Sequence, residues 1–248
     1  MSVDISDRFV TDLMYENMQQ LRRLTPISFD RKVEEQCGYR DTDGFDTNLY
    51  YHLGIKYGLP VNKCRLITYV GGKKINMSAD AWVGVKQLAR ISHDTKEWIK
   101  FYESIQSNLR LRLLWPSHRL PTINTSRYTC FHDRVDLLLA DLKRWFSGQP
   151  ALLSKTYRNR ETGIWLKSFD SFGGFTKSMQ LDWLIKDGYI IDLVNLTALA
   201  DQVDLDELRH NRDDQSMRRY VVNSIKLVTD AYSVSYTHLR AHETTLHR

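Results

Sequence analysis

A chain of 248 residues is long enough for one large domain or two small ones. Its composition, with 42% apolar and 26% charged residues, excludes wholesale disorder. The net charge of +5 arises from 35 Lys and Arg residues interleaved with 30 Asp and Glu residues, which permits a nucleic-acid partner without requiring one. No apolar run approaches the roughly 18 residues that cross a bilayer, and residues 1–10 lack the features of a signal peptide. Cys37, Cys64 and Cys130 are scattered, without a C-x-x-C spacing. These features predict a cytoplasmic protein that does not act on membranes.

The end of the chain differs from the rest. From Val234 the sequence reads VSYTHLRAHETTLHR and contains His238, His242 and His247. It resembles a peptide found at the ends of proteins translated from metagenomic reads, where sequencing-adapter DNA has been read as coding sequence. We therefore expect residues 233–248 to be an artefactual tail and leave them out of the fold interpretation, with a His-rich metal-binding tract as the alternative. Residues 1–232 are then expected to form one domain.

The first part of the chain predicts helices followed by a hairpin. Apolar residues at a helical period predict a helix over residues 7–24, and a short helix is expected over residues 48–57. Residues 65–70 are strand formers, and Gly71-Gly72 is a two-residue turn of the kind that joins antiparallel strands. Residues 73–77 should therefore pair back, which gives a hairpin tipped by lysines. The Gly-Gly-Lys-Lys sequence lacks the spaced second glycine and the Lys-Ser/Thr ending of a phosphate-binding loop.

Two helices are expected after the hairpin. Ser78 can cap the first and Asp94 the second, and Pro116 and Pro121 then predict an extended connection. The strongest helix is predicted for residues 130–146, with Thr129 as its N-cap and Gly148 as its stop. Its apolar stripe consists of Val135, Leu138, Leu139, Leu142 and Phe146.

The C-terminal part predicts a more mixed structure. An aromatic region covers residues 165–175, and a helix is expected to end near Asp187-Gly188, before a strand over residues 189–194. A final helix is expected over residues 215–232. Because no internal repeat or low-complexity linker is present, the sequence predicts an α+β, mostly helical single domain with a small antiparallel hairpin.

Residues 114–148 contain two short polar motifs. The first is Ile123-Asn124-x-x-Arg127, and the second is Asp133-Arg134-x-Asp136-Leu137, followed by a basic, aromatic helix end and a glycine. With the segments 50–53 and 169–183, these motifs resemble a family of bacterial proteins known only as a domain of unknown function. The resemblance implies a bacterial or phage-borne cytoplasmic protein and implies no reaction or cofactor. The positions that match the family's motifs are Asn124, Arg127, Asp133, Arg134 and Asp136.

These motifs form the candidate site. Asp133 and Asp136 are three positions apart, and His132 is four positions from Asp136, so one continuous helix would place all three on one face. Two carboxylates that close require a nearby cation, which Arg127 or Arg134 could supply. The cluster is then either a structural ion-pair network or a site that holds a phosphate or a metal. We predict that Arg127 lies within ion-pair reach of Asp133 or Asp136. The candidate ligand-binding residues are Asn124, Arg127, Asp133, Arg134 and Asp136, and no metal ligand is assigned.

Binding of nucleic acid or of a phosphate-bearing ligand is the first functional hypothesis. Basic pairs recur along the chain between aromatic residues, and this mixture is typical of surfaces that contact phosphates and stack bases. The pairs are Arg110/Arg112, Lys143/Arg144, Arg158/Arg160 and Arg218/Arg219, and the aromatic residues are Trp115, Tyr128, Trp145 and Tyr157. Solvated basic side chains that cover apolar neighbours are the structural alternative.

Two other functions remain open. His52, His93 and Asp94, with Asp133 or Asp136, follow the order of ligands in helical metal-dependent phosphohydrolases. A non-catalytic interaction protein is the third hypothesis. Nothing in the sequence indicates a cofactor or sets the oligomeric state.

Overall fold

The computed structural model describes residues 58–59, 61–62, 65–81, 112–117, 121–199, 215–224 and 226–227. The strands are β1 (Val61–Asn62), β2 (Arg65–Val70), β3 (Lys73–Ala81), β4 (Arg112–Pro116), β5 (Ile185–Lys186) and β6 (Tyr189–Ile190). The helices are α6 (Ile123–Phe131), α7 (Val135–Phe146), α8 (Ser154–Tyr157), α9 (Arg160–Leu166), α10 (Phe172–Ser178) and the short 3-10 helix η2 (Asp182–Leu184). The described part is thus α+β, as predicted. The helices expected at residues 7–24 and 48–57, the helix capped by Asp94 and the tail at 233–248 lie outside the described residues.

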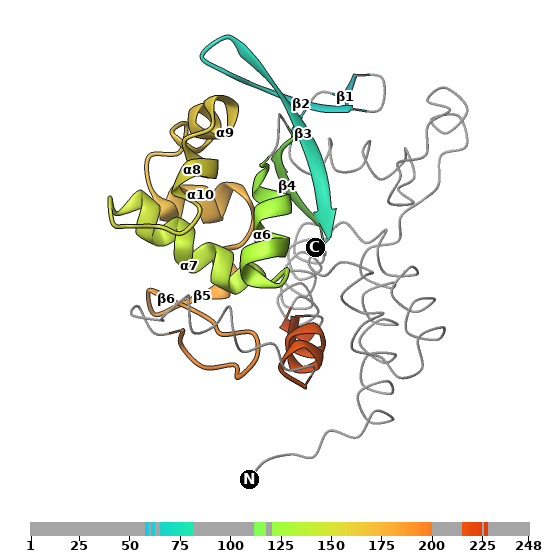
Figure 1. The fold of residues 1–248 in the computed structure, drawn as a ribbon, viewed down its shortest axis with the longest axis vertical. Helices are drawn as coiled ribbons and strands as arrows, with labels where there is room; N and C mark the ends of the chain where they lie inside the picture. The colour runs from blue at the N-terminus through green and yellow to red at the C-terminus, as the bar shows by residue number, and fades with distance from the viewer. Residues whose placement is uncertain are drawn as a thin grey trace, which may run out of the picture.

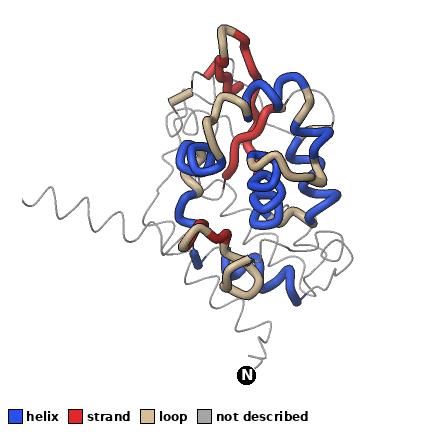
Figure 2. Tube along the Cα trace, turned by 90° about the vertical axis from the view of Figure 1, so that its left-hand side faces the viewer, coloured by secondary structure: helices blue, strands red, loops and turns tan. Residues whose placement is uncertain are grey.

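An antiparallel sheet in the order β1-β2-β3-β4 forms one side of the described structure. The predicted hairpin is confirmed: Val70 pairs with Lys73 across Gly71 and Gly72, whose φ values are 55° and 76°. A two-residue turn with positive φ at both positions matches the twist of the strands it joins, and glycine adopts it without steric cost. The helices gather on one side of the sheet in Figure 1. Viewed from that side, the tip of the hairpin projects beyond them at the top of Figure 2.

The hairpin continues further than the sequence predicts. Strand β3 runs to Ala81, and Ser78 pairs with Trp115 of β4, so Ser78 does not cap a helix. The expectation failed because β4, distant in sequence, gives the second half of β3 a strand partner. The segment that ends at Pro116 is extended, as predicted, and it forms this strand.

The predicted helix over residues 130–146 is two helices, α6 and α7. His132 and Asp133 separate them, with φ values of 51° and 69° in the left-handed region. Thr129 is not an N-cap, because its hydroxyl donates to the carbonyl oxygen of Thr125 one turn earlier. The cap of α6 is Thr122, which forms a capping box with Thr125. The apolar stripe begins only at Val135, so the pattern gave no sign of α6.

The end of α7 agrees with the prediction. Gly148 has a φ of 71° and follows the cap residue Ser147. The amides of Gly148 and Gln149 donate to the carbonyl oxygens of Trp145 (3.1 Å) and Arg144 (2.9 Å). This is the Schellman arrangement, which satisfies carbonyl groups that the helix itself leaves without partners.

Aromatic rings join the sheet to the helices. Trp115 of β4 stacks on Phe175 of α10 at 6.2 Å between ring centroids and meets Trp165 of α9 edge-on at 6.0 Å. Phe169 packs edge-on against both Trp165 and Phe175, at 5.2 and 5.3 Å. Such edge-on and offset pairs add to the burial of apolar area. The predicted aromatic region is therefore the part of the core where α9 and α10 meet β4.

The segment after α10 differs from the prediction. Helix α10 ends at Ser178, and Asp187-Gly188, with φ values of 50° and 80°, forms the turn between β5 and β6. The dipeptide therefore closes a hairpin, where a helix end was expected. Strand β6 contains only Tyr189 and Ile190, followed by a single bridge from Ile191 to Ala198. Residues 215–224 and 226–227 are helical, in agreement with the final helix.

Candidate functional site

The turn between α6 and α7 brings Arg127 to two carboxylates. Arg127, in the middle of α6, is 0% exposed. Its Nη2 atom lies 2.6 Å from Oδ2 of Asp80 in β3 and 3.0 Å from Oδ1 of Asp133. Its Nη1 atom donates to the backbone carbonyl of Asp133 at 2.6 Å. The predicted Arg127–Asp133 ion pair is confirmed, and it joins the sheet, α6 and the turn.

A second arginine lies on the other side of the same turn. Arg134 binds Asp136 in a fork, with Nε 3.1 Å from Oδ1 and Nη2 2.6 Å from Oδ2, and Nη2 also lies 3.0 Å from Asp192. Asp136 is fully buried and also accepts the amides of Leu137 and Leu193. Burial lowers the pKa of Arg134, but the charges of Asp136 and Asp192 outweigh that effect and raise it above the usual value.

Tyr220, from the C-terminal helical segment, contacts Arg134 and the turn that Arg127 also binds. Its hydroxyl accepts the amide of Val135 at 3.0 Å and donates to the carbonyl of Asp133 at 3.3 Å. The guanidinium carbon of Arg134 lies 5.9 Å from the centre of its ring, within cation–π range. Burial raises the pKa of Tyr220, with Arg127 opposing and Asp136 adding to the rise. We call the set Asp80, Arg127, Asp133, Arg134, Asp136, Asp192 and Tyr220 the polar core.

Four of the five predicted site residues thus lie in the polar core. Asp133 and Asp136 do not share a helix face, because Asp133 belongs to the left-handed turn and α7 begins only at Val135. Asn124 is half-buried in the first turn of α6 and is not one of the residues that the polar core joins.

Sequence reasoning missed the remaining members of the polar core. Asp80 lies 47 positions from Arg127, Asp192 lies 58 from Arg134, and Tyr220 lies 85 from Val135. The sequence placed Asp80 in the first turn of a helix capped by Ser78, where a carboxylate is ordinary, so nothing marked it as a partner of Arg127.

A further buried carboxylate, Asp141 of α7, also went unpredicted. It accepts the amides of Leu152 (2.6 Å) and Leu153 (3.0 Å) and the hydroxyl of Tyr157 (2.8 Å). Burial and the charge of Asp141 raise the pKa of the Tyr157 hydroxyl well above its usual value. The contacts fix α8 and the loop before it against α7.

The predicted basic and aromatic residues divide into buried and exposed groups. Trp115 and Tyr157 are 0% exposed, so their rings cannot stack on a base. Arg144 donates to the carbonyl of Pro150 and Lys143 to that of Gly188, so both stabilise the local fold. Tyr128 is exposed.

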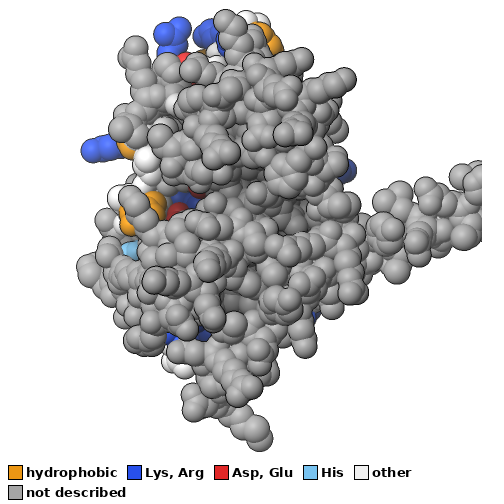
Figure 3. Space-filling view, turned by 90° about the vertical axis from the view of Figure 1, so that its right-hand side faces the viewer, with side chains coloured by type: hydrophobic (Ala, Val, Ile, Leu, Met, Phe, Trp, Pro, Cys, Tyr) orange, Lys and Arg blue, Asp and Glu red, His pale blue; other side chains and the backbone are white. Residues whose placement is uncertain are grey.

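Within the described part, burial removes more carboxylates than cations from the surface. The fold buries Asp133, Asp136 and Asp141, whereas Arg127 is the only Lys or Arg side chain buried in the described part. The exposed cations of this part are Lys73, Lys74, Lys155, Arg158, Arg160, Lys167, Lys177, Lys186 and Lys226; the exposed carboxylates are Asp170, Asp182 and Asp187. Lys and Arg side chains are visible at the top of Figure 3, the end of the molecule where the β2–β3 hairpin turns in Figure 1.

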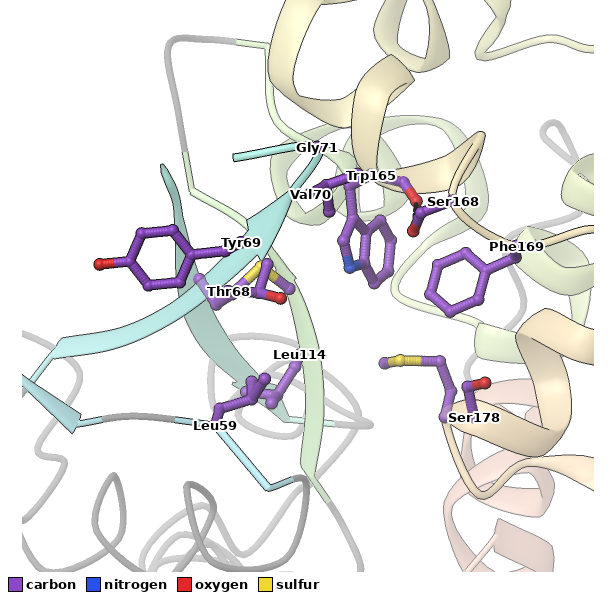
Figure 4. A pocket seen from close by; sticks show the side chains of 12 residues that line it. Leu59, Thr68, Tyr69, Val70, Gly71, Leu114, Trp165, Ser168, Phe169 and Ser178 are labelled. Atoms are coloured by element: carbon purple, nitrogen blue, oxygen red, sulfur yellow. Dashed lines mark hydrogen bonds between the residues drawn. The ribbon is translucent and has the colours of Figure 1, made fainter. Parts of the chain in front are cut away.

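A pocket of about 420 Å³ lies between the sheet and the helices α9 and α10. Its strand side consists of Leu59, Thr68, Tyr69, Val70, Gly71, Met77 and Leu114, and its helical side of Trp165, Ser168, Phe169, Ser178 and Met179. Figure 4 shows Trp165 and Phe169 facing the strands across the space, whereas the ring of Tyr69 points away from them. The volume is typical of a small-ligand site, and the lining combines apolar and aromatic side chains with the hydroxyl groups of Thr68, Ser168 and Ser178.

Three exposed lysines adjoin lining residues of this pocket, one across the sheet and two in the sequence. Lys73 pairs directly with Val70, and opposite residues of an antiparallel pair share a face of the sheet. Lys167 precedes Ser168, and Lys177 precedes Ser178. None of the three lysines forms an ion pair within the part of the chain that the structure describes.

The residues proposed for a phosphohydrolase centre are only partly described. His52, His93 and Asp94 lie outside the described ranges, and Asp133 and Asp136 are each bound to an arginine. Among the described residues, no three His, Cys, Asp or Glu side chains are placed to hold a metal ion. No helix in these ranges has the length and apolarity needed to cross a membrane.

The described structure defines an α+β protein with a closed polar core and a separate pocket of mixed polar and apolar lining. The chain belongs to a family of unknown function (DUF6994), whose model matches residues 62–231. The matched range contains the polar core and all described strands and helices except the start of β1, which agrees with the resemblance drawn from the two motifs. No curated protein and no solved structure matches the chain.

Proposed function

We propose that this protein binds a nucleotide unit in the pocket between the sheet and α9–α10, and that the polar core is the scaffold that holds this pocket together. The observation that carries the proposal is the combination of a pocket with aromatic residues in its lining and exposed lysines adjacent to its lining residues. A nucleotide has a flat base and a charged phosphate, so it requires both kinds of surface within a short distance.

The burial of the polar core supports a structural role. Arg127 and Asp136 are both 0% exposed, and each arginine already has two carboxylates within 3.0 Å. A phosphate could reach Arg127 only by displacing carboxylates from a site closed to solvent. Arg127 also connects α6 to Asp80 of β3, the strand that supplies Met77 to the pocket. We therefore place the proposed phosphate-binding site at the pocket and not at Arg127 and Arg134.

The pocket supports recognition of a base. Phe169 is half-buried and presents aromatic carbon to a planar group, whereas Trp165 is only 5% exposed and forms part of the pocket wall. Thr68, Ser168 and Ser178 supply hydroxyl groups for hydrogen bonds. Lys73, Lys167 and Lys177 can each reach toward a phosphate, because the charge sits at the end of a flexible four-carbon stem. Of the three exposed carboxylates in the described part, only Asp170 adjoins a pocket residue in the sequence.

The test is calorimetric titration of the full chain with nucleoside monophosphates, the matching nucleosides and inorganic phosphate. We expect the monophosphate to bind most tightly, because the nucleoside lacks the charge and inorganic phosphate lacks the base. Phe169→Ala should weaken monophosphate binding about tenfold, since base–aromatic stacking contributes roughly 1–3 kcal/mol. Lys167→Gln and Lys73→Gln should each weaken binding of the monophosphate and leave binding of the nucleoside unchanged.

Lys186→Gln is the matched control, because Lys186 is an equally exposed lysine in β5, which does not line the pocket. Equal affinity for monophosphate and nucleoside would refute the phosphate contact. Equal loss in Lys186→Gln and Lys167→Gln would show non-specific charge attraction. Absence of binding to all three ligands would overturn the proposed function.

A further inference from the structure

Helices α8 and α9 and the turn that joins them carry a group of exposed cations. Lys155, Arg158 and Arg160 are exposed, and we call them the basic ridge. None of them forms an ion pair within the described ranges. The neighbouring carboxylates in sequence are Glu161, which is half-buried, and Asp170, which is exposed beyond the pocket residues Ser168 and Phe169.

The ridge is held rigidly by the residues between its cations. Tyr157 is fully buried and donates to Asp141, and the hydroxyl of Thr156 lies 3.0 Å from that of Ser126 in α6. Gly163 of α9 packs so closely on α8 that an added Cβ would lie 3.0 Å from the carbonyl oxygen of Tyr157. The backbone that carries the ridge is therefore fixed against α6 and α7, and its cations have a defined position relative to α9.

One cation of the ridge and one pocket residue belong to the same helix. Arg160 is the first residue of α9 and Trp165, in the pocket lining, is five positions later. At about 1.5 Å and 100° per residue, their backbones are separated by about 7–8 Å along the helix axis and their side chains point about 140° apart. Neighbouring phosphates of an extended nucleic-acid strand are separated by a distance comparable to the axial one, so a strand with one base in the pocket that curves around α9 would bring its next phosphates to the ridge.

We infer that the ligand of the pocket is one nucleotide of a single-stranded nucleic acid, whose adjoining phosphates bind Lys155, Arg158 and Arg160. The inference rests on the proposed function and extends it, because a free mononucleotide would leave the ridge without a role. An unpaired strand is required, since a base within a duplex cannot enter a pocket without leaving its stack. Sequence-independent cations with an aromatic site for a base are typical of single-strand binding.

The experiment measures fluorescence anisotropy of labelled oligonucleotides of one, two, four and eight nucleotides, and of an eight-base-pair duplex, with the full chain. We expect affinity to rise at least tenfold between one and four nucleotides, and the single strand to bind more tightly than the duplex. The triple variant Lys155→Gln/Arg158→Gln/Arg160→Gln should abolish this rise and leave mononucleotide affinity unchanged. It should also reduce the slope of log affinity against log salt by about 2, because each single-strand phosphate contact contributes roughly 0.7.

Single variants provide the matched comparison. Arg160→Gln should weaken the four-nucleotide strand, and Lys186→Gln should not. If mononucleotides bind and affinity does not rise with length, the inference fails while the proposed pocket function stands. If strands bind through the ridge but Phe169→Ala has no effect on any length, the pocket function fails and the inference fails with it. Duplex binding equal to single-strand binding would also overturn the inference.

Discussion

Arg127 and Asp133 are joined by two contacts, one through the side chain of Asp133 (3.0 Å) and one through its backbone carbonyl (2.6 Å). The second contact requires the left-handed turn at His132 and Asp133, which directs that carbonyl back toward α6. The ion pair and the turn therefore depend on each other. A residue with φ near +60° that is not glycine costs about 1–3 kcal/mol, so the buried guanidinium stabilises a turn that is unfavourable by itself.

Replacement of Arg127 tests this dependence. In Arg127→Met, Asp80 and Asp133 lose their buried cation, and we expect the free energy of unfolding to fall by about 3–5 kcal/mol. Arg127→Lys should cost less but still about 2 kcal/mol, because one ammonium group cannot reproduce the fork of donors. Urea denaturation followed by circular dichroism measures both. The exposed Arg158→Lys is the control and should change stability by under about 0.5 kcal/mol.

Asp136→Asn separates a scaffold from a ligand site. Asp136 accepts two bonds from Arg134 and two from backbone amides, so the variant leaves Arg134 without its fork partner. We expect a loss of about 3 kcal/mol in unfolding free energy and unchanged nucleotide affinity in the remaining folded protein. Asp187→Asn, at an exposed turn, should be neutral. A variant of Asp136 with full stability and lost ligand binding would assign the polar core to the site.

The buried tyrosines predict a loss of stability at high pH. The pKa values of Tyr157 and Tyr220 are raised in the folded protein, chiefly by burial, so the folded state holds their protons more tightly than the unfolded state. Their contribution is complete below the unfolded pKa of about 10 and decreases as the pH rises above that value. Chemical denaturation between pH 7 and 11 should show the decrease. The decrease in unfolding free energy should be smaller in Tyr220→Phe and the same as in the wild type in Tyr69→Phe, a change at an exposed site. An unfolding free energy that does not change with pH in the wild-type chain would contradict the prediction.

Replacement of two glycines by alanine should change the stability of the protein in opposite directions. Gly148 has a φ of 71° and open space around its Cβ position, so Gly148→Ala should cost about 1 kcal/mol from backbone conformation alone. Gly148→Asn should cost less, since asparagine tolerates this region. Gly173 lies inside α10, where an added Cβ would meet only Ser171 Oγ at 3.9 Å, and Gly173→Ala should stabilise by roughly 0.5–1 kcal/mol. Thermal unfolding of the three variants measures the difference in sign.

The sequence by itself determined the features that depend on neighbouring residues. The β2–β3 hairpin follows from Gly71-Gly72 between two strand-forming runs, the body of α7 from its apolar stripe, and the end of α7 from Gly148, because turn conformation and helical periodicity are local properties. The four charged residues of the motifs were also correctly selected as a cluster. The Arg127–Asp133 pair was predictable because its members are only six positions apart.

Tertiary structure alone decided where these residues lie and what they contact. Ser78 became a strand residue because β4 was available to pair with it, and the helix predicted over residues 130–146 divided because the turn at His132–Asp133 is stabilised by contacts to Arg127 and Tyr220. Asp80, Asp192 and Tyr220 joined the polar core from distant positions, and α9 met the sheet to form the pocket. These outcomes depend on which apolar surfaces are buried against each other. The free energy of that burial comes from contacts between residues that are distant in the sequence, so local patterns do not reveal it.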